Sequence, residues 1–139
     1  MVISIYGGSG SGKTTLATAL QQYFFNDGRG CYLLSGDDYP HWILKRNDEE
    51  QLRVYKEAGE DGLRGYLGTK KEIDFARINE VLAAFHEGKD TITLRHLERE
   101  DGEISSEETD FSGTSVLLLE WTHGGSDDLH GVDLSVFLE

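Results

Sequence analysis

The residue types most suited to chemistry lie near the start of the 139-residue sequence, in a glycine-rich segment. Residues 7–14 read GGSGSGKT and match the phosphate-binding pattern GxxxxGKS/T. Its glycines let successive backbone N–H groups converge on phosphate oxygens, and the helix that follows adds the positive end of its dipole. The lysine reaches the terminal phosphates, and the threonine offers its hydroxyl to Mg²⁺. We therefore predict a site for a nucleoside triphosphate and Mg²⁺, formed by Gly8, Gly10, Ser11, Gly12, Lys13, Thr14 and Thr15.

Three carboxylates stand where apolar segments end. Glu120 closes one apolar run, and Asp37 and Asp38 follow another. Hard cations prefer oxygen ligands, so Asp37 and Glu120 are candidates, together with Thr14, for holding Mg²⁺ or its waters. Asp37 is also the candidate for orienting an acceptor hydroxyl and taking its proton. Two plainer interpretations stay open: Glu120 as a solvated acid, and the aspartate pair as a turn or helix cap.

These residues need strands that bring them to one place. Short β-branched or continuous apolar runs predict strands, and apolar residues at spacings of three and four predict helices. The predicted strands are residues 2–6, 31–34, 91–94, 115–120 and 132–138, and the predicted helices are residues 15–25, 47–66 and 74–87. Residues 104–113 are polar and only loosely patterned, so no element is predicted there.

Strands that alternate with helices and carry continuous apolar runs predict an α/β fold, with a mostly parallel sheet and helices on both faces. The length suits a single domain over residues 1–139. Ligands of such sheets bind at the carboxyl ends of the strands. The glycine-rich segment, the aspartate pair and Glu120 all fall at that edge, which predicts one shared site.

The charge balance limits the class of partner. The sequence carries 13 Lys and Arg against 26 Asp and Glu, a net charge of −13. A protein that binds the phosphate backbone of a nucleic acid needs a basic face, so we expect no nucleic-acid partner. The apolar runs are far shorter than the roughly 20 residues of a membrane span, and no secretory signal is evident. We therefore expect no membrane association, a cytoplasmic location and a small-molecule substrate.

At these sites the sequence resembles the small-molecule P-loop kinases of the uridine kinase, nicotinamide riboside kinase and phosphoribulokinase group. Residues 7–15 look like their phosphate loop, and residues 35–39, SGDDY, resemble the serine-x-aspartate-x-aromatic turn after their second strand. In that family the first aspartate of the turn acts as a base or as a ligand of metal-bound water. The resemblance therefore favours Asp37 over Asp38.

Further segments extend the resemblance over nearly the whole chain. Residues 73–89 are similar to the family's helix before the substrate strand, and residues 116–120 resemble its Walker B strand, with Trp121 where a glycine usually follows. Related kinases continue past the strand matching residues 132–138 into an arginine-rich lid and a fifth strand. The resemblance thus implies a P-loop NTPase fold that lacks this C-terminal lid and fifth strand.

Candidate substrate residues lie outside the phosphate loop. Arg95, His96 and Arg99 stand out in a half of the chain that is otherwise acidic: residues 90–139 carry 2 basic and 13 acidic side chains. They could dock an anionic or carbonyl-bearing acceptor, or simply balance nearby glutamates. Trp42 could stack against a ring or serve as ordinary packing. Asp38, which follows the candidate base Asp37, is the last of the candidate substrate residues.

The main hypothesis is an ATP-dependent enzyme that phosphorylates a hydroxyl of a nucleoside-like or sugar-like small molecule with the help of Mg²⁺. Lys13 and Asp37 are its expected catalytic residues. An NTP hydrolase or switch is one alternative, although the guanine-reading motif of GTPases has only a poor match in residues 69–72, TKKE. A nucleotide-binding module without catalysis is the other alternative.

Overall fold

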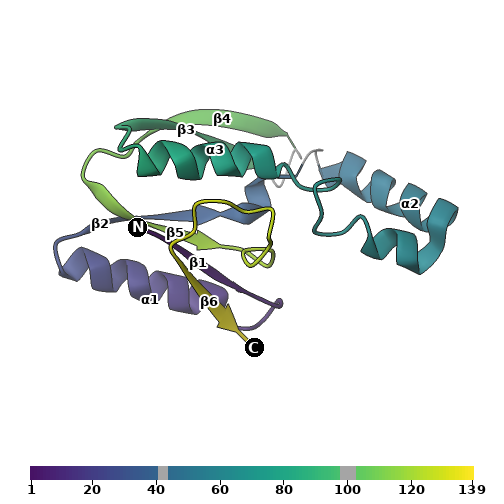
Figure 1. Cartoon of the computed structure of the whole chain (residues 1–139), viewed down its shortest axis with the longest axis horizontal. Coiled ribbons are helices and arrows are strands. Elements are labelled where there is room, and N and C mark those ends of the chain that lie inside the picture. Colours follow the sequence, from purple (N-terminus) through teal and green to yellow (C-terminus); the bar gives the residue numbers. More distant parts are fainter. Residues whose placement is uncertain (41–43, 98–102) are drawn as a thin grey trace.

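The computed structural model describes residues 1–40, 44–97 and 103–139 (Figure 1). Its centre is a four-stranded parallel sheet with the strand order β2-β5-β1-β6. The strands are β1 (Val2–Gly7), β2 (Gly30–Ser35), β5 (Thr114–Glu120) and β6 (Leu134–Leu138). Because the pairings are parallel, the carboxyl ends of the strands lie along one edge of the sheet. The predicted α/β class is therefore confirmed.

Both faces of the sheet are covered (Figure 1). Helix α1 (Lys13–Asn26) lies on one face and helix α3 (Phe75–His86) on the other. Strands β3 (Thr91–Leu97) and β4 (Ile104–Asp110) form an antiparallel hairpin beside α3. The result is a layered molecule in which the sheet is the middle layer.

Strand β5 shows why the apolar runs are continuous rather than alternating. Val116 and Leu118 pack into the core on the α1 side, while Leu117 and Leu119 pack into the core on the α3 side. All four side chains are at most 2% exposed. Burial on both faces removes the polar positions that a half-exposed strand would need. β5 is therefore fixed between two cores, with Glu120 at its end.

The β3–β4 hairpin differs from the prediction. Residues 104–110, where no element was predicted, pair along their whole length with β3, which itself runs to Leu97 rather than to Leu94. The hairpin is a separate sheet and does not join the parallel one. β4 is polar because most of its side chains are exposed, and its backbone pairing supplies the hydrogen bonds that hold it. The sequence of this segment therefore has no apolar periodicity that would predict a strand.

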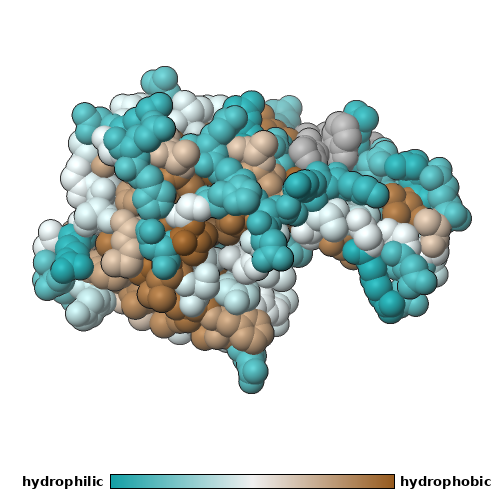
Figure 2. Space-filling model, viewed as in Figure 1, coloured by the Kyte–Doolittle hydropathy of each residue, from teal (hydrophilic) through white to brown (hydrophobic). Residues whose placement is uncertain are grey.

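Helix α2 (Leu44–Arg64) extends away from the layered body (Figure 1). It confirms the helix predicted over residues 47–66, with a break at Gly59, whose φ of 68° lies in the left-handed region. Hydrophilic side chains dominate its visible face (Figure 2). Arg53 forms ion pairs with Glu50 at 2.9 Å and Glu57 at 2.8 Å, contacts that stabilise an exposed helix only slightly.

The visible surface over β6 is more hydrophobic than that over α2 (Figure 2). Leu134 and Phe137 are 50% and 57% exposed, and the Phe137 ring lies 5.3 Å from that of Tyr6. Within the described ranges, no helix combines the length and the apolar character needed to cross a bilayer.

A close approach between Gly36 and Trp121 fixes the segment after β2. Gly36 begins the short 3₁₀ helix η1 (Gly36–Asp38), and a Cβ atom there would overlap the indole of Trp121. Trp121 is 2% exposed and also packs against the ring of Phe75, at 5.5 Å between centroids. A glycine is therefore required at position 36 because an adjacent strand end places a large side chain there.

We predict that Gly36→Ala destabilises the protein, because the added methyl group forces the Trp121 indole from its place. Overpacking of this kind costs about 1–3 kcal/mol, which equilibrium denaturation in urea would measure. Gly65→Ala is the matched control, since a Cβ atom there meets its nearest neighbour at an ordinary 3.5 Å. Equal unfolding free energies for the two variants would contradict the packing argument.

Candidate functional site

The phosphate loop connects β1 to α1. Gly10 and Gly12 adopt left-handed conformations, with φ of 78° and 92°, which only glycine takes without strain. The backbone N–H of Ser11 donates to the carbonyl of Gly8 at 3.2 Å. The Lys13 ammonium donates to the carbonyls of Gly7 at 3.1 Å and Gly8 at 2.8 Å. The glycine-rich segment therefore forms a curled loop, and the Lys13 ammonium lies against the first carbonyls of that loop.

Several features of this loop suit it to a triphosphate. Cβ atoms placed on Gly8, Gly10 and Gly12 would meet no atom within 4 Å, so the space over the glycines is open. The Ser11 hydroxyl oxygen is buried and has no hydrogen-bond partner among the described residues. A buried hydroxyl without a partner is costly, and phosphate oxygens would accept from it. The residues present therefore fit the phosphate groups of a nucleotide.

Thr14 and Glu120 meet at the edge of the sheet. The Thr14 hydroxyl donates to Glu120 Oε1 at 2.6 Å, across 106 residues of sequence. β5 lies between β1 and β2, and Glu120 pairs in register with Ile5 on one side and Ser35 on the other. A hydroxyl and a carboxylate beside phosphate groups are the ligands that Mg²⁺ uses while keeping several waters. No group of three or more His, Cys, Asp or Glu side chains able to hold a metal occurs within the described ranges.

Asp37 and Asp38 lie in different surroundings. The Ser35 hydroxyl caps η1 by accepting from the backbone N–H of Asp37 at 3.4 Å, so neither aspartate is that cap. Asp38 Oδ1 accepts from the backbone N–H of Leu97 at 3.2 Å and thereby ties η1 to β3. Asp37 instead lines a cavity at the end of β2. The two neighbours are therefore not interchangeable.

We call this cavity the acceptor pocket. Its volume is about 250 Å³. The described residues that line it are Gly36, Asp37, Pro40, Asn47, Glu72, Ile73, Leu97 and His123. Its lining residues come from five parts of the chain: the segment after β2, the start of α2, the segment before α3, the end of β3 and the segment after β5. Asp37 is the one predicted catalytic side chain among these lining residues.

Sequence reasoning missed three polar residues of this pocket. Glu72 is buried at 8% exposure and accepts hydrogen bonds from the backbone N–H of Gly68 and from the side-chain amides of Asn47 and Gln51. The ring of His123 packs edge-on against that of Trp121, with 5.5 Å between centroids. Asn47 and Glu72 lie 25 residues apart, so no local motif marks the pair.

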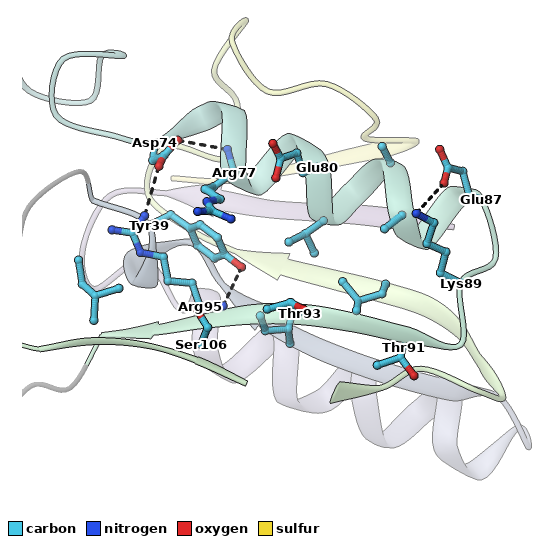
Figure 3. A pocket seen from close by; sticks show the side chains of 16 residues that line it. Tyr39, Asp74, Arg77, Glu80, Glu87, Lys89, Thr91, Thr93, Arg95 and Ser106 are labelled. Carbon is cyan, nitrogen blue, oxygen red and sulfur yellow. Dashed lines mark hydrogen bonds and ion pairs between the residues drawn. The ribbon is translucent and has the colours of Figure 1, made fainter. Parts of the chain in front are cut away.

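A second, larger cavity of about 910 Å³ lies between α3 and β3 (Figure 3). Arg95 lies at one end of it and is only 12% exposed. Its guanidinium pairs with Asp74 at 3.3 Å and donates to the carbonyl of Pro40. Asp74 also accepts from the backbone N–H of Arg77 at 3.2 Å and so caps α3. None of the described residues lining this cavity belongs to the phosphate loop.

Tyr39 lines the larger cavity at the same end as Arg95 (Figure 3). Its side chain is 1% exposed, and its hydroxyl accepts from the backbone N–H of Arg95 at 3.5 Å. Burial raises the pKa of Tyr39, against the lowering effect of this hydrogen bond. The phenol therefore stays neutral and joins η1 to β3 as a structural contact.

The described members of the predicted substrate set, Asp38, Arg95 and His96, are not among the lining residues of the acceptor pocket. Arg95 and Asp38 are held by the contacts just described, and His96 pairs with Glu107 across the hairpin at 3.3 Å. Trp42 and Arg99 lie outside the described residues. A substrate role for these side chains remains a prediction.

Comparisons with known proteins complete the picture of the site. Over all 139 residues the chain is 89% identical to a bifunctional alpha-galactosidase/sucrose kinase of Mediterraneibacter gnavus, but it spans only 15% of that relative's length. Its fold is similar to a possible uridine kinase from Bacillus stearothermophilus, with a TM-score of 0.72 and 22% identity over 100% of this chain and 70% of the other.

The fold is also similar to that of phosphoribulokinase from Rhodobacter spheroides, with a TM-score of 0.74 and 18% identity over 98% of this chain and 50% of the other. At such identities the likeness shows a shared fold. A family model described as Phosphoribulokinase / Uridine kinase family matches residues 2–139. The chain therefore belongs to the phosphoribulokinase/uridine kinase family.

Proposed function

We propose that this chain transfers the γ-phosphate of ATP to a hydroxyl group of a sugar-like small molecule, with Mg²⁺ as cofactor. One observation carries the proposal: the Thr14–Glu120 contact and Asp37 lie at the ends of adjacent strands, beside both the phosphate loop and a polar pocket. The 89% identity to a protein named as a sucrose kinase supports a carbohydrate acceptor. Dependence on ATP fits a cytoplasmic location.

Binding of the nucleotide falls to the phosphate loop. Its backbone N–H groups and the Ser11 hydroxyl would donate to the phosphate oxygens, and Lys13 would place its ammonium against the terminal phosphates. Thr14 and Glu120 would hold Mg²⁺ or its waters. Charge on the transferring phosphate would be neutralised by the bound Mg²⁺. Phosphoryl transfer is mainly a matter of such positioning and charge stabilisation.

Asp37 would act on the acceptor. Asp37 lines the acceptor pocket, where its carboxylate would accept a hydrogen bond from the reacting hydroxyl. It would take the proton as the new P–O bond forms and as the bond between the γ-phosphorus and the bridging oxygen breaks, so that ADP leaves. A hydrolase that activates water needs no pocket of this size beside its base. The acceptor pocket therefore favours a kinase over a hydrolase.

Product analysis tests the proposal directly. Reactions with Mg-ATP and a panel of sucrose, monosaccharides, nucleosides and small alcohols should yield a phosphorylated acceptor, detected by chromatography and mass spectrometry. Lys13→Ala should weaken binding of an ATP analogue about 10- to 100-fold, because a charge-assisted contact is lost, and should abolish the product. Lys56→Ala removes the same charge from an exposed position on α2 and should change neither. ADP without a phosphorylated acceptor would instead indicate a hydrolase.

The two aspartates give a matched pair of variants. Asp37→Asn should lower the transfer rate about 10²- to 10⁴-fold and leave binding of the ATP analogue unchanged, because an amide cannot take the proton. Asp38→Asn keeps an oxygen that can accept from the Leu97 N–H and should keep most activity. Single-turnover rates at saturating ATP would measure both. Equal losses in the two variants would remove Asp37 from its proposed role.

The proposed role of Glu120 in binding Mg²⁺ can be tested by a Mg²⁺ titration. Glu120→Gln removes a charged oxygen ligand, so we expect the Mg²⁺ concentration for half-maximal activity to rise about tenfold or more. Glu108→Gln, on an exposed part of β4, is the control for the charge change. An unchanged Mg²⁺ titration for Glu120→Gln would leave Glu120 as a structural partner of Thr14.

A further inference from the structure

The larger cavity follows an edge of β3 that no other strand covers in the described ranges. β3 and β4 form a sheet of their own, and no third described strand pairs with β3. Residues 91–95 of β3 all line the cavity (Figure 3). Because side chains alternate between the two faces of a strand, an unbroken run of lining residues places the cavity along the edge of the strand. Helix α3 supplies the opposite wall.

Backbone groups at the start of this edge point away from β4. The N–H groups of Arg95 and Leu97 donate to side chains outside the hairpin, at 3.5 and 3.2 Å, and so do not pair with β4. In an antiparallel ladder such outward positions recur at every second residue. Thr91 and Thr93 therefore also direct their N–H and C=O groups outward. Among the described residues, no backbone group outside the hairpin bonds either threonine.

This open edge has the features of a site for strand addition. Its outward N–H groups and the neighbouring C=O groups are enough for an added segment of about four or five residues. The lining also includes Val81, Ile92 and Leu94, which are at most 5% exposed and supply apolar contact. The cavity volume of about 910 Å³ lies within the usual range of ligand sites, about 300–1,000 Å³. At such edges main-chain hydrogen bonds give affinity, and contacts with alternate side chains give specificity.

Acidic side chains surround the start of β3. Glu80 and Glu87 are exposed and line the cavity from α3. Glu108 and Asp110 of β4 stand opposite the two outward threonines in register. Lys89 also lines the cavity here and pairs with Glu87 at 3.4 Å (Figure 3). The acids outnumber this lysine and attract a basic occupant, and the net charge of −13 over the whole sequence adds to that attraction.

We propose that the edge of β3 binds an extended peptide segment of a partner protein, with basic side chains at alternate positions, as a third strand of the hairpin sheet. Arg77 and Arg95 line the opposite end of the cavity (Figure 3), and the undescribed residues 98–102 follow that end of β3. The basic side chains therefore lie at the start of β3, beside Glu80 and Glu87. This interaction does not depend on the proposed kinase function.

Fluorescence anisotropy with two labelled peptides tests the charge requirement. The probes are Val-Lys-Val-Lys-Val-Thr and Val-Glu-Val-Glu-Val-Thr, which differ only in the charge of two side chains. The lysine peptide should bind at least about tenfold tighter at low ionic strength, and its affinity should fall as salt is added. Glu80→Gln should weaken it about two- to fivefold, the usual size of one exposed ion pair. Glu49→Gln makes the same charge change on an exposed part of α2 and should leave binding unchanged.

N-methylation of the lysine peptide tests strand addition on the unaltered chain. A methyl group on a peptide nitrogen removes one donor and keeps the charge. Because alternate amides of an added strand face β3, methylation of one amide should weaken binding about tenfold or more, and methylation of the next should have little effect. Equal losses at every position would indicate non-specific charge attraction and overturn the proposal. Equal binding of the two unmethylated peptides, or no binding of either, would also overturn it.

Two proline variants give the matching test on the protein. Thr93→Pro removes an outward N–H from the edge of β3, and Glu108→Pro removes one from the outer edge of β4 in the same residue pair. Proline is tolerated at such positions because the ladder does not use the lost donor. Thr93→Pro should weaken binding of the lysine peptide about tenfold or more, and Glu108→Pro no more than Glu108→Gln. Equal losses in the two proline variants would overturn binding at this edge. A concentration-dependent dimer that Thr93→Pro abolishes would make a second copy the occupant and the peptide proposal wrong.

Discussion

The hydrogen bond between the Thr14 hydroxyl and Glu120 joins the first turn of α1 to the end of β5, and the geometry of the candidate site depends on it. β5 is buried on both faces and is paired on both sides, so Glu120 cannot shift without moving β1 and β2 as well. The strand β2 that it pairs with continues directly into η1 and Asp37. The nucleotide side and the acceptor side of the site are therefore fixed to the same rigid element, which is what precise positioning for phosphoryl transfer needs.

Trp121 provides the second fixed point, directly after Glu120. Its indole occupies the space that a side chain at position 36 would need, and it packs against Phe75 of α3 and against His123. The packing of this indole therefore sets the position of η1 and Asp37.

The parts of the molecule that could be predicted are those whose cause is local in sequence. The phosphate loop follows from eight consecutive residues, and β5 follows from one unbroken apolar run. β4 could not be predicted, because it is held by pairing with β3 and buries few of its own side chains. Glu72 could not be predicted as a pocket residue either, since its partners Asn47 and Gln51 lie 25 and 21 residues away. Non-local polar contacts leave no periodicity in the sequence.

The nucleotide half and the acceptor half of the candidate site are stabilised by different interactions. The nucleotide half stands on the core of the sheet, where β5 contributes side chains that are at most 2% exposed. The acceptor half depends on α2, which extends from the body and is joined to it through polar contacts at Glu72 and Asn47. A hydrogen bond contributes only about 0.5–1.5 kcal/mol between neutral groups and about 1.5–3 kcal/mol to a carboxylate, so we expect these few contacts to yield before the core does. Under the proposed function, changes in α2 and its polar contacts would therefore alter the choice of acceptor while the nucleotide site keeps its geometry.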